Sequence, residues 1–86
     1  MEHMIFEQMA ERWPAPIVSR TEVQMFTGGA ISEKYLANLD SRNLGPEGRF
    51  HIGRKVVYPV HEFVKWLKQR STPIPRKQRS APLRIK

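Results

Sequence analysis

The stretch Ser32-Glu-Lys-Tyr-Leu-Ala-Asn-Leu-Asp-Ser-Arg42 decides the expected fold of this chain, because helical spacing gives it two unlike faces. One face carries Tyr35, Leu36 and Leu39, and the other carries Glu33, Lys34, Asn38, Ser41 and Arg42. Ser32 is the expected N-cap, with Ile31 and Leu36 placed as a hydrophobic staple around it. The pattern predicts a short helix with one buried side and one side facing water.

A second capped helix is predicted just upstream. Ser19-Arg-Thr-Glu22 has the spacing of a capping box, and Val18 and Val23 stand at the staple positions around it. This helix should end near Phe26 or Thr27, because Gly28-Gly29 can take the left-handed conformation that ends helices. Two capped helices joined by a glycine turn predict a helix-turn-helix.

A β-hairpin and a third helix are predicted downstream. Arg49–Ile52 and Lys55–Tyr58 read as short strands around Gly53-Arg54, and Pro59 fits the first turn of the helix that follows. In that helix Val60, Phe63, Val64 and Leu67 form an apolar stripe with Trp66 at its edge. The core is predicted to contain Tyr35, Leu36, Leu39, Phe50, Ile52, Val57, Phe63, Trp66 and Leu67.

These elements predict three parts, with one folded domain at residues 17–70. Residues 1–16 form an N-terminal helical segment, stopped by Pro14-Ala-Pro16, that either covers the core or offers a self-association surface. Residues 71–86 contain three prolines, five bases and no acid, which predicts a disordered basic tail.

The charge balance favours a polyanionic partner, either nucleic acid or an anionic membrane surface. Fifteen Lys and Arg stand against eight Asp and Glu, for a formal net charge of +7. The chain has no cysteine, so disulfides and thiolate metal sites are excluded. No apolar run is long enough for a signal peptide or a membrane span, so we expect a cytoplasmic protein without a membrane partner.

Residues 17–70 resemble the winged helix-turn-helix domain of the excisionase family, which is related to AlpA-type phage regulators and to the DNA-binding heads of MerR-type proteins. The resemblance lies in the order and spacing of several motifs: Ser19-Arg-Thr-Glu22-Val23, Ile31-Ser32, Pro46, Gly53-Arg54, Tyr58-Pro59 and Glu62-Phe-Val-Lys-Trp-Leu67. It implies an α+β domain of three helices with a two-stranded β wing. In such domains the second helix enters the major groove and the wing lies on the flanking backbone or minor groove.

The resemblance also implies which residues of the second helix touch base edges, namely Glu33, Lys34, Ala37, Asn38 and Ser41. Asn38 can pair bidentately with adenine, Glu33 can accept a hydrogen bond from cytosine, and Ala37 can touch a thymine methyl group. An ordinary exposed helix surface remains the alternative for Asn38 and Glu33.

Backbone contacts are expected from several other residues. They are Arg20 and Thr21 in the first helix, Arg42 after the second, and Arg49, His51, Arg54 and Lys55 of the wing. Arg54 should reach furthest because it lies at the hairpin tip, although charge on an edge strand also protects against aggregation. The tail bases Arg76, Lys77, Arg79, Arg84 and Lys86 either add electrostatic affinity or dock a protein such as integrase or another phage protein.

No catalytic, metal or cofactor site is predicted, since His3, His51 and His61 lack ligand-like spacing. The expected function is sequence-preferring binding of double-stranded DNA, as a recombination directionality factor or a small transcriptional regulator, with self-association on DNA left open. One alternative is a phage packaging or assembly adaptor that binds a protein through its tail or N-terminal helix. An RNA-binding module is disfavoured because the A-form major groove is too narrow for a helix, and stacking of single-stranded bases on Trp or Tyr is disfavoured as well.

Overall fold

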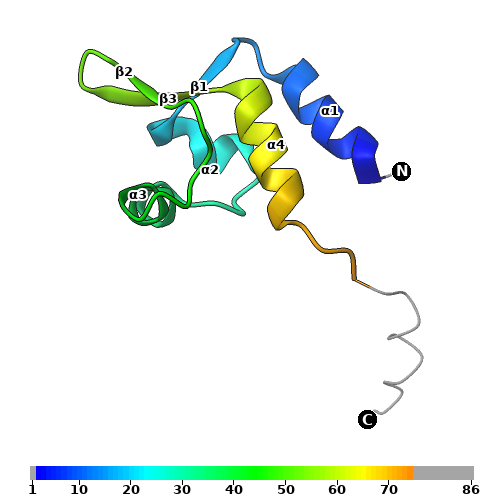
Figure 1. The fold of residues 1–86 in the computed structure, drawn as a ribbon. Coiled ribbons are helices and arrows are strands. Elements are labelled where there is room, and N and C mark those ends of the chain that lie inside the picture. The colour runs from blue at the N-terminus through cyan, green and yellow to red at the C-terminus, as the bar shows by residue number, and fades with distance from the viewer. Residues whose placement is uncertain (1, 75–86) are drawn as a thin grey trace.

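The computed structural model describes residues 2–74 of the chain, which form an α+β fold (Figure 1). Within this range the elements are, in order, α1 (Glu2–Arg12), β1 (Ile17–Ser19), the 3-10 turn η1 (Arg20–Glu22), α2 (Val23–Phe26), α3 (Glu33–Ser41), β2 (Phe50–Ile52), β3 (Lys55–Pro59) and α4 (Val60–Arg70). None of these helices is both long and apolar enough to cross a membrane. The predicted tail bases Arg76, Lys77, Arg79, Arg84 and Lys86 lie outside the described residues.

The predicted capping box starts η1 and α2. The Glu22 carboxylate accepts a hydrogen bond from the Ser19 amide at 3.2 Å and another from the Ser19 hydroxyl at 3.0 Å. Val18 and Val23, the predicted staple, are both fully buried. The chain is therefore fixed in direction at the point where it leaves β1 and turns into α2.

The turn between α2 and α3 depends on glycine and on one threonine. Gly28 and Gly29 have φ values of 65° and 91°, in the left-handed region that glycine enters without steric cost. The Thr27 hydroxyl donates to the Val23 carbonyl at 2.8 Å and accepts from the Ile31 amide at 3.0 Å. The Ser32 hydroxyl then accepts from the Tyr35 amide at 3.1 Å, which confirms Ser32 as the N-cap of α3.

The sheet has three antiparallel strands in the order β1-β3-β2, so the predicted β2–β3 hairpin is confirmed and β1 is a third strand that the sequence did not predict. β1 pairs with β3 in the register Val18 to Tyr58, and β2 pairs with β3 in the register His51 to Val56. The central strand runs directly into α4, because Pro59 is both the last residue of β3 and the N-cap of α4. Pro59 therefore precedes the helix instead of lying in its first turn.

The core lies where α2, α3 and α4 meet the sheet, and Phe63 is at its centre. The Phe63 ring makes edge-to-face contacts with Phe26, Tyr58 and Trp66 at centroid distances of 5.4 to 5.6 Å. Full burial of such a ring contributes roughly 2–3 kcal/mol. Helix α1 packs on α4, and partly buried side chains from this helix and from the residue that follows it join the same core, namely Phe6, Met9, Ala10 and Trp13.

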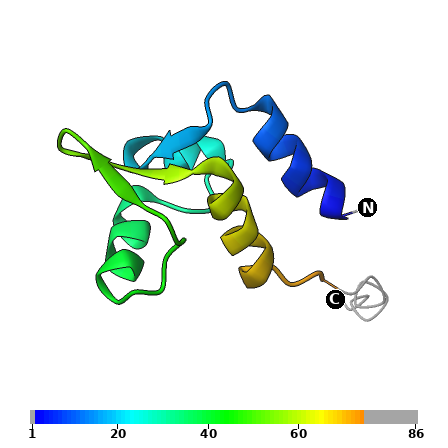
Figure 2. The same cartoon turned by 45° about the horizontal axis from the view of Figure 1, so that its top comes forward.

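Three residues predicted to be in the core are exposed instead. Tyr35, Phe50 and Ile52 have exposed fractions of 42%, 45% and 53%. β2 is an edge strand, and the tip of its hairpin extends beyond the helices (Figure 2). Tyr35 lies on the flank of α3 beside the buried stripe. Trp66, predicted at the edge of the α4 stripe, is only 7% exposed.

Candidate nucleic-acid interface

All five residues that the sequence placed on the polar face of α3 are exposed, namely Glu33, Lys34, Asn38, Ser41 and Arg42. Because a helix turns about 100° per residue, the buried residues Leu36, Leu39 and Asp40 define one side. Lys34, Asn38 and Ser41 lie opposite them and are all exposed. The middle of the outer face is therefore one cation, one amide and one hydroxyl.

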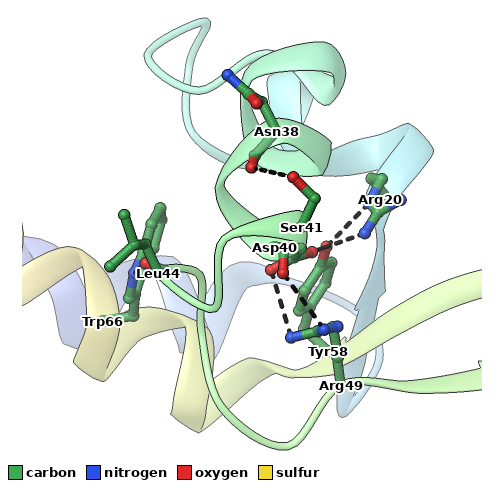
Figure 3. Close-up of polar contacts among 8 residues, drawn as sticks. All are labelled: Arg20, Asn38, Asp40, Ser41, Leu44, Arg49, Tyr58 and Trp66. Carbon is green, nitrogen blue, oxygen red and sulfur yellow. Dashed lines mark hydrogen bonds and ion pairs between the residues drawn. The ribbon is translucent and has the colours of Figure 1, made fainter.

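The other predicted base-edge residues lie around this centre. Ala37 is partly buried and Glu33 is exposed, both toward the flank that carries Asp40. The Ser41 hydroxyl donates to the Asn38 carbonyl at 2.7 Å, so its proton is used within the helix. The Asn38 side chain points away from the body of the molecule (Figure 3). It is the only side-chain amide among the five candidates.

The β2–β3 hairpin brings the predicted wing residues together. Gly53 at the tip has a φ of 63°, which allows a tight two-residue turn, and His51, Arg54 and Lys55 are exposed around it. Both ribbon views place this hairpin and α3 on the same side of the molecule, away from α1 (Figures 1 and 2). Helix α1 carries Glu2, Glu7 and Glu11, so the acidic helix lies opposite the basic hairpin.

A buried polar cluster joins α3 to the root of the hairpin, and the sequence did not single it out. Asp40 is only 4% exposed. Its Oδ2 atom accepts a hydrogen bond from Arg20 Nη2 at 2.7 Å and a short one from the Tyr58 hydroxyl (Figure 3). Arg20 Nε also donates to the Tyr58 hydroxyl at 3.1 Å. One carboxylate on α3 thereby fixes side chains from η1 and β3.

This cluster changes the part that Arg20 plays. We expected Arg20 to contact phosphate, but its Nε and Nη2 groups bind inside the molecule and its side chain is only 23% exposed. Thr21, the neighbouring candidate, is exposed, and its hydroxyl lies 2.9 Å from that of Ser19. Arg42, at the C-cap of α3, is exposed too.

Arg49 links the cluster to the hairpin. Its Nη1 atom lies 3.8 Å from Asp40 Oδ1, and its Nη2 donates to the Asp40 carbonyl at 3.4 Å. The Arg49 side chain remains 39% exposed, so this cation can also face an external anion. A cation at the C-terminal end of α3 is favoured by the helix dipole as well.

Gly45 allows the cluster to close. A Cβ atom at this position would lie 1.9 Å from Asp40 Oδ1, so any side chain there would force the carboxylate to move. The Oδ1 atom is buried and has no hydrogen-bond partner among the described residues. The position of Asp40, one helical turn after Leu36 and directly after Leu39, was the only sequence signal for its burial.

The environment shifts two pKa values in the cluster. Burial, together with the hydrogen bond to Asp40, raises the pKa of the Tyr58 phenol to about 12. Burial alone would lower the pKa of Arg20, but its hydrogen bonds to Tyr58 and Asp40 outweigh that effect and raise it. Tyr58 is therefore a neutral donor and Arg20 a fixed cation over the whole physiological range.

The described residues offer no group of three or more His, Asp or Glu side chains that could hold a metal ion. The arrangement is instead a polar helix face beside a basic hairpin, held together by a carboxylate between two arginines. Comparisons of the chain with family models, with curated proteins and with solved structures find no match in any of the three.

Proposed function

We propose that this chain binds double-stranded DNA with sequence preference, without catalytic activity, in the manner of an excisionase. In this proposal η1, α2 and α3 act as a helix-turn-helix, and the β2–β3 hairpin acts as its wing. Helix α3 enters the major groove, which at about 12 Å wide admits a helix, and the wing lies on the backbone or in the minor groove. The protein would act as a recombination directionality factor or as a small transcriptional regulator.

The observation that carries the proposal is that α3 and the β2–β3 hairpin lie on the same side of the molecule. A recognition helix and a wing can contact one duplex only if they lie on the same side of the protein. Both ribbon views place α3 and the hairpin on one side. Lys34, Asn38 and Ser41 supply the donors and acceptors of the helix face, while Arg54 and Lys55 supply positive charge on the hairpin. The acidic helix α1 lies on the far side, where it does not repel phosphate.

The residues have separate roles in this proposal. Asn38 reads one base pair, which is worth roughly 1–3 kcal/mol of discrimination when the contact is bidentate. Arg49, Arg54 and Lys55 bind phosphates and so contribute affinity for any sequence. Integrase or another phage protein, docked through the basic tail, is the proposed protein partner.

Selection from a randomised duplex library, followed by fluorescence anisotropy on the selected duplex, tests the proposal. Asn38→Ala should relax the preference at one base pair, whereas Arg54→Ala should weaken binding to all duplexes and reduce the salt slope by about 1. Gln8→Ala and Arg12→Ala are matched controls on exposed positions of α1 and should change neither quantity. Duplex affinity that is unaffected by both N38A and R54A would refute the groove model.

A further inference from the structure

One flank of α3 carries an aromatic and arginine cluster that the proposed interface has not used. Tyr35, at 42% exposed, lies on the side of α3 that faces the end of α4. Arg70, in the last turn of α4, donates from Nη2 to the Tyr35 hydroxyl at 2.9 Å. A hollow between the start of α3 and the end of α4 is lined by Ser32, Tyr35, Leu67 and Arg70.

The Arg70 guanidinium is held in place before any ligand arrives. Its Cζ atom lies 5.0 Å from the centre of the Trp66 ring, a cation–π geometry. Trp66 is itself fixed, because it is 7% exposed and its Nε1 donates to the Leu44 carbonyl at 2.9 Å. A guanidinium has five N–H donors, and Arg70 donates only one hydrogen bond among the described residues. An exposed arginine that is already ordered loses little entropy on binding an anion.

Arg70 and the hairpin contact opposite flanks of α3. On α3, Asp40 faces Arg20, Tyr58 and Arg49 at the root of the hairpin, whereas Tyr35 faces the opposite flank. In the close-up, Trp66, which Arg70 contacts, and the Asp40 cluster lie on opposite sides of the segment that leaves α3 (Figure 3). Arg70 and the hairpin thus bracket α3 from its two sides.

We infer that Arg70, ordered by Tyr35 and Trp66, is a second phosphate-binding site for duplex DNA. This inference rests on the proposed function. A helix in the major groove has a sugar-phosphate backbone on each side of it. The hairpin would bind the backbone on one side, and Arg70 the backbone on the other. The end of α4 then becomes part of the DNA interface, and two-sided phosphate contacts set the register of α3 in the groove.

A matched pair of substitutions on one helix tests the inference. Arg70→Gln keeps a long side chain over Trp66 and an N–H donor for Tyr35, but removes the charge. Lys68→Gln removes the same charge from an exposed position that lines the groove between α4 and α1. Binding to the selected duplex is measured from 50 to 300 mM salt, with thermal unfolding of each variant as a check on folding.

The two variants should differ in affinity and in salt dependence. R70Q should weaken duplex binding about five-fold at 100 mM salt and reduce the salt slope by about 0.9, the contribution of one phosphate contact. K68Q should remain within about two-fold of the wild type, with an unchanged slope. A purely structural role for Arg70 would lower thermal stability without moving the slope. Equal effects of R70Q and K68Q would overturn the inference.

A second measurement uses the unmodified chain and does not depend on the folding of a variant. Phenylglyoxal modifies exposed arginines, and mass spectrometry then reports the rate at each site. The selected duplex should slow modification of Arg70 several-fold and leave Arg12 on α1 unchanged. Modification of Arg70 at the same rate with and without DNA would also overturn the inference. If R54A still weakens binding in that case, the proposed function stands and only the role of Arg70 fails.

Discussion

Replacing Asp40 with alanine tests whether the buried cluster holds α3 against the sheet. The substitution removes the acceptor for the Arg20 guanidinium and for the Tyr58 hydroxyl. Tyr58 is fully buried, so water cannot replace the lost acceptor without opening the structure. Asp40→Ala should therefore cost much more than the removal of an exposed acid such as Glu47.

The expected size follows from the burial of the partners. Removing one partner of a fully buried ion pair costs about 3–5 kcal/mol. The Arg20 side chain is 23% exposed, so its charge regains some hydration and the cost falls toward the lower end of that range. A fold of this size has a total stability of roughly 4–10 kcal/mol. We expect D40A to lose about 3 kcal/mol, which would lower the urea midpoint by roughly 2 M.

A double-mutant cycle separates the ion pair from other effects of the substitutions. Urea unfolding is followed by the fluorescence of Trp13 and Trp66 in the wild type, R20A, D40A and the double variant. The double variant should cost little more than D40A alone, with a coupling energy of about 2 kcal/mol, because it leaves no uncompensated charge. A loss below 1 kcal/mol in D40A, or additive losses in the double variant, would refute this account of the cluster.

Two further predictions concern the same region. Gly45→Ala places a methyl group on the Asp40 carboxylate and should cost about 1–3 kcal/mol in urea unfolding, but less than half of that in a D40A background, where the obstructing atoms are gone. An equal cost in both backgrounds would show that the clash lies elsewhere. The pKa of the Tyr58 phenol is raised from 10.0 to about 12 in the folded protein, so this phenol ionises at a lower pH in the unfolded chain. The free energy of unfolding should therefore be unchanged below pH 10 and fall by roughly 2–3 kcal/mol between pH 10 and 12. In a Tyr35→Phe variant, absorbance at 295 nm reports Tyr58 alone, and a midpoint near 10 would contradict its burial.

The parts of the fold that were predictable are those with local causes. Ser32 caps α3 through an atom three residues away, and Gly53 turns the hairpin by its own backbone freedom. The apolar stripe of α4 repeats at the helical period, so its burial could be read from spacing. Each of these features can be recognised from neighbouring residues, without knowing which distant residues it contacts in the fold.

The missed features depend on residues that are distant in sequence. β1 spans only Ile17–Ser19 and follows Pro16, and it becomes a strand because Val18 pairs with Tyr58, forty residues later. Asp40 is buried because three partners from other elements surround it. In both cases the decisive interaction is tertiary, and no local pattern encodes it.

The exposed apolar residues show a second limit of prediction from sequence, because they were expected in the core. Tyr35, Phe50 and Ile52 are residue types that are common in protein cores. More than half of a folded surface is apolar, however, so residue type alone does not predict burial. The edge position of β2 leaves Phe50 and Ile52 uncovered, and this could be known only once the strand order was known.

The cluster also decides which basic residues are available to a polyanion. The single carboxylate of Asp40 can neutralise only one of the two arginines beside it. Arg20 is the neutralised one, because its Nη2 lies 2.7 Å from Asp40 Oδ2, whereas Arg49 Nη1 lies 3.8 Å from Asp40 Oδ1. Arg49 therefore keeps most of its field at the surface, beside the C-terminal end of α3. Since Arg49 directly precedes β2, an anion bound by its guanidinium would lie beside the start of the hairpin. By pairing with Arg20, the buried acid thus leaves the charge of Arg49 available at the junction of the two proposed recognition elements.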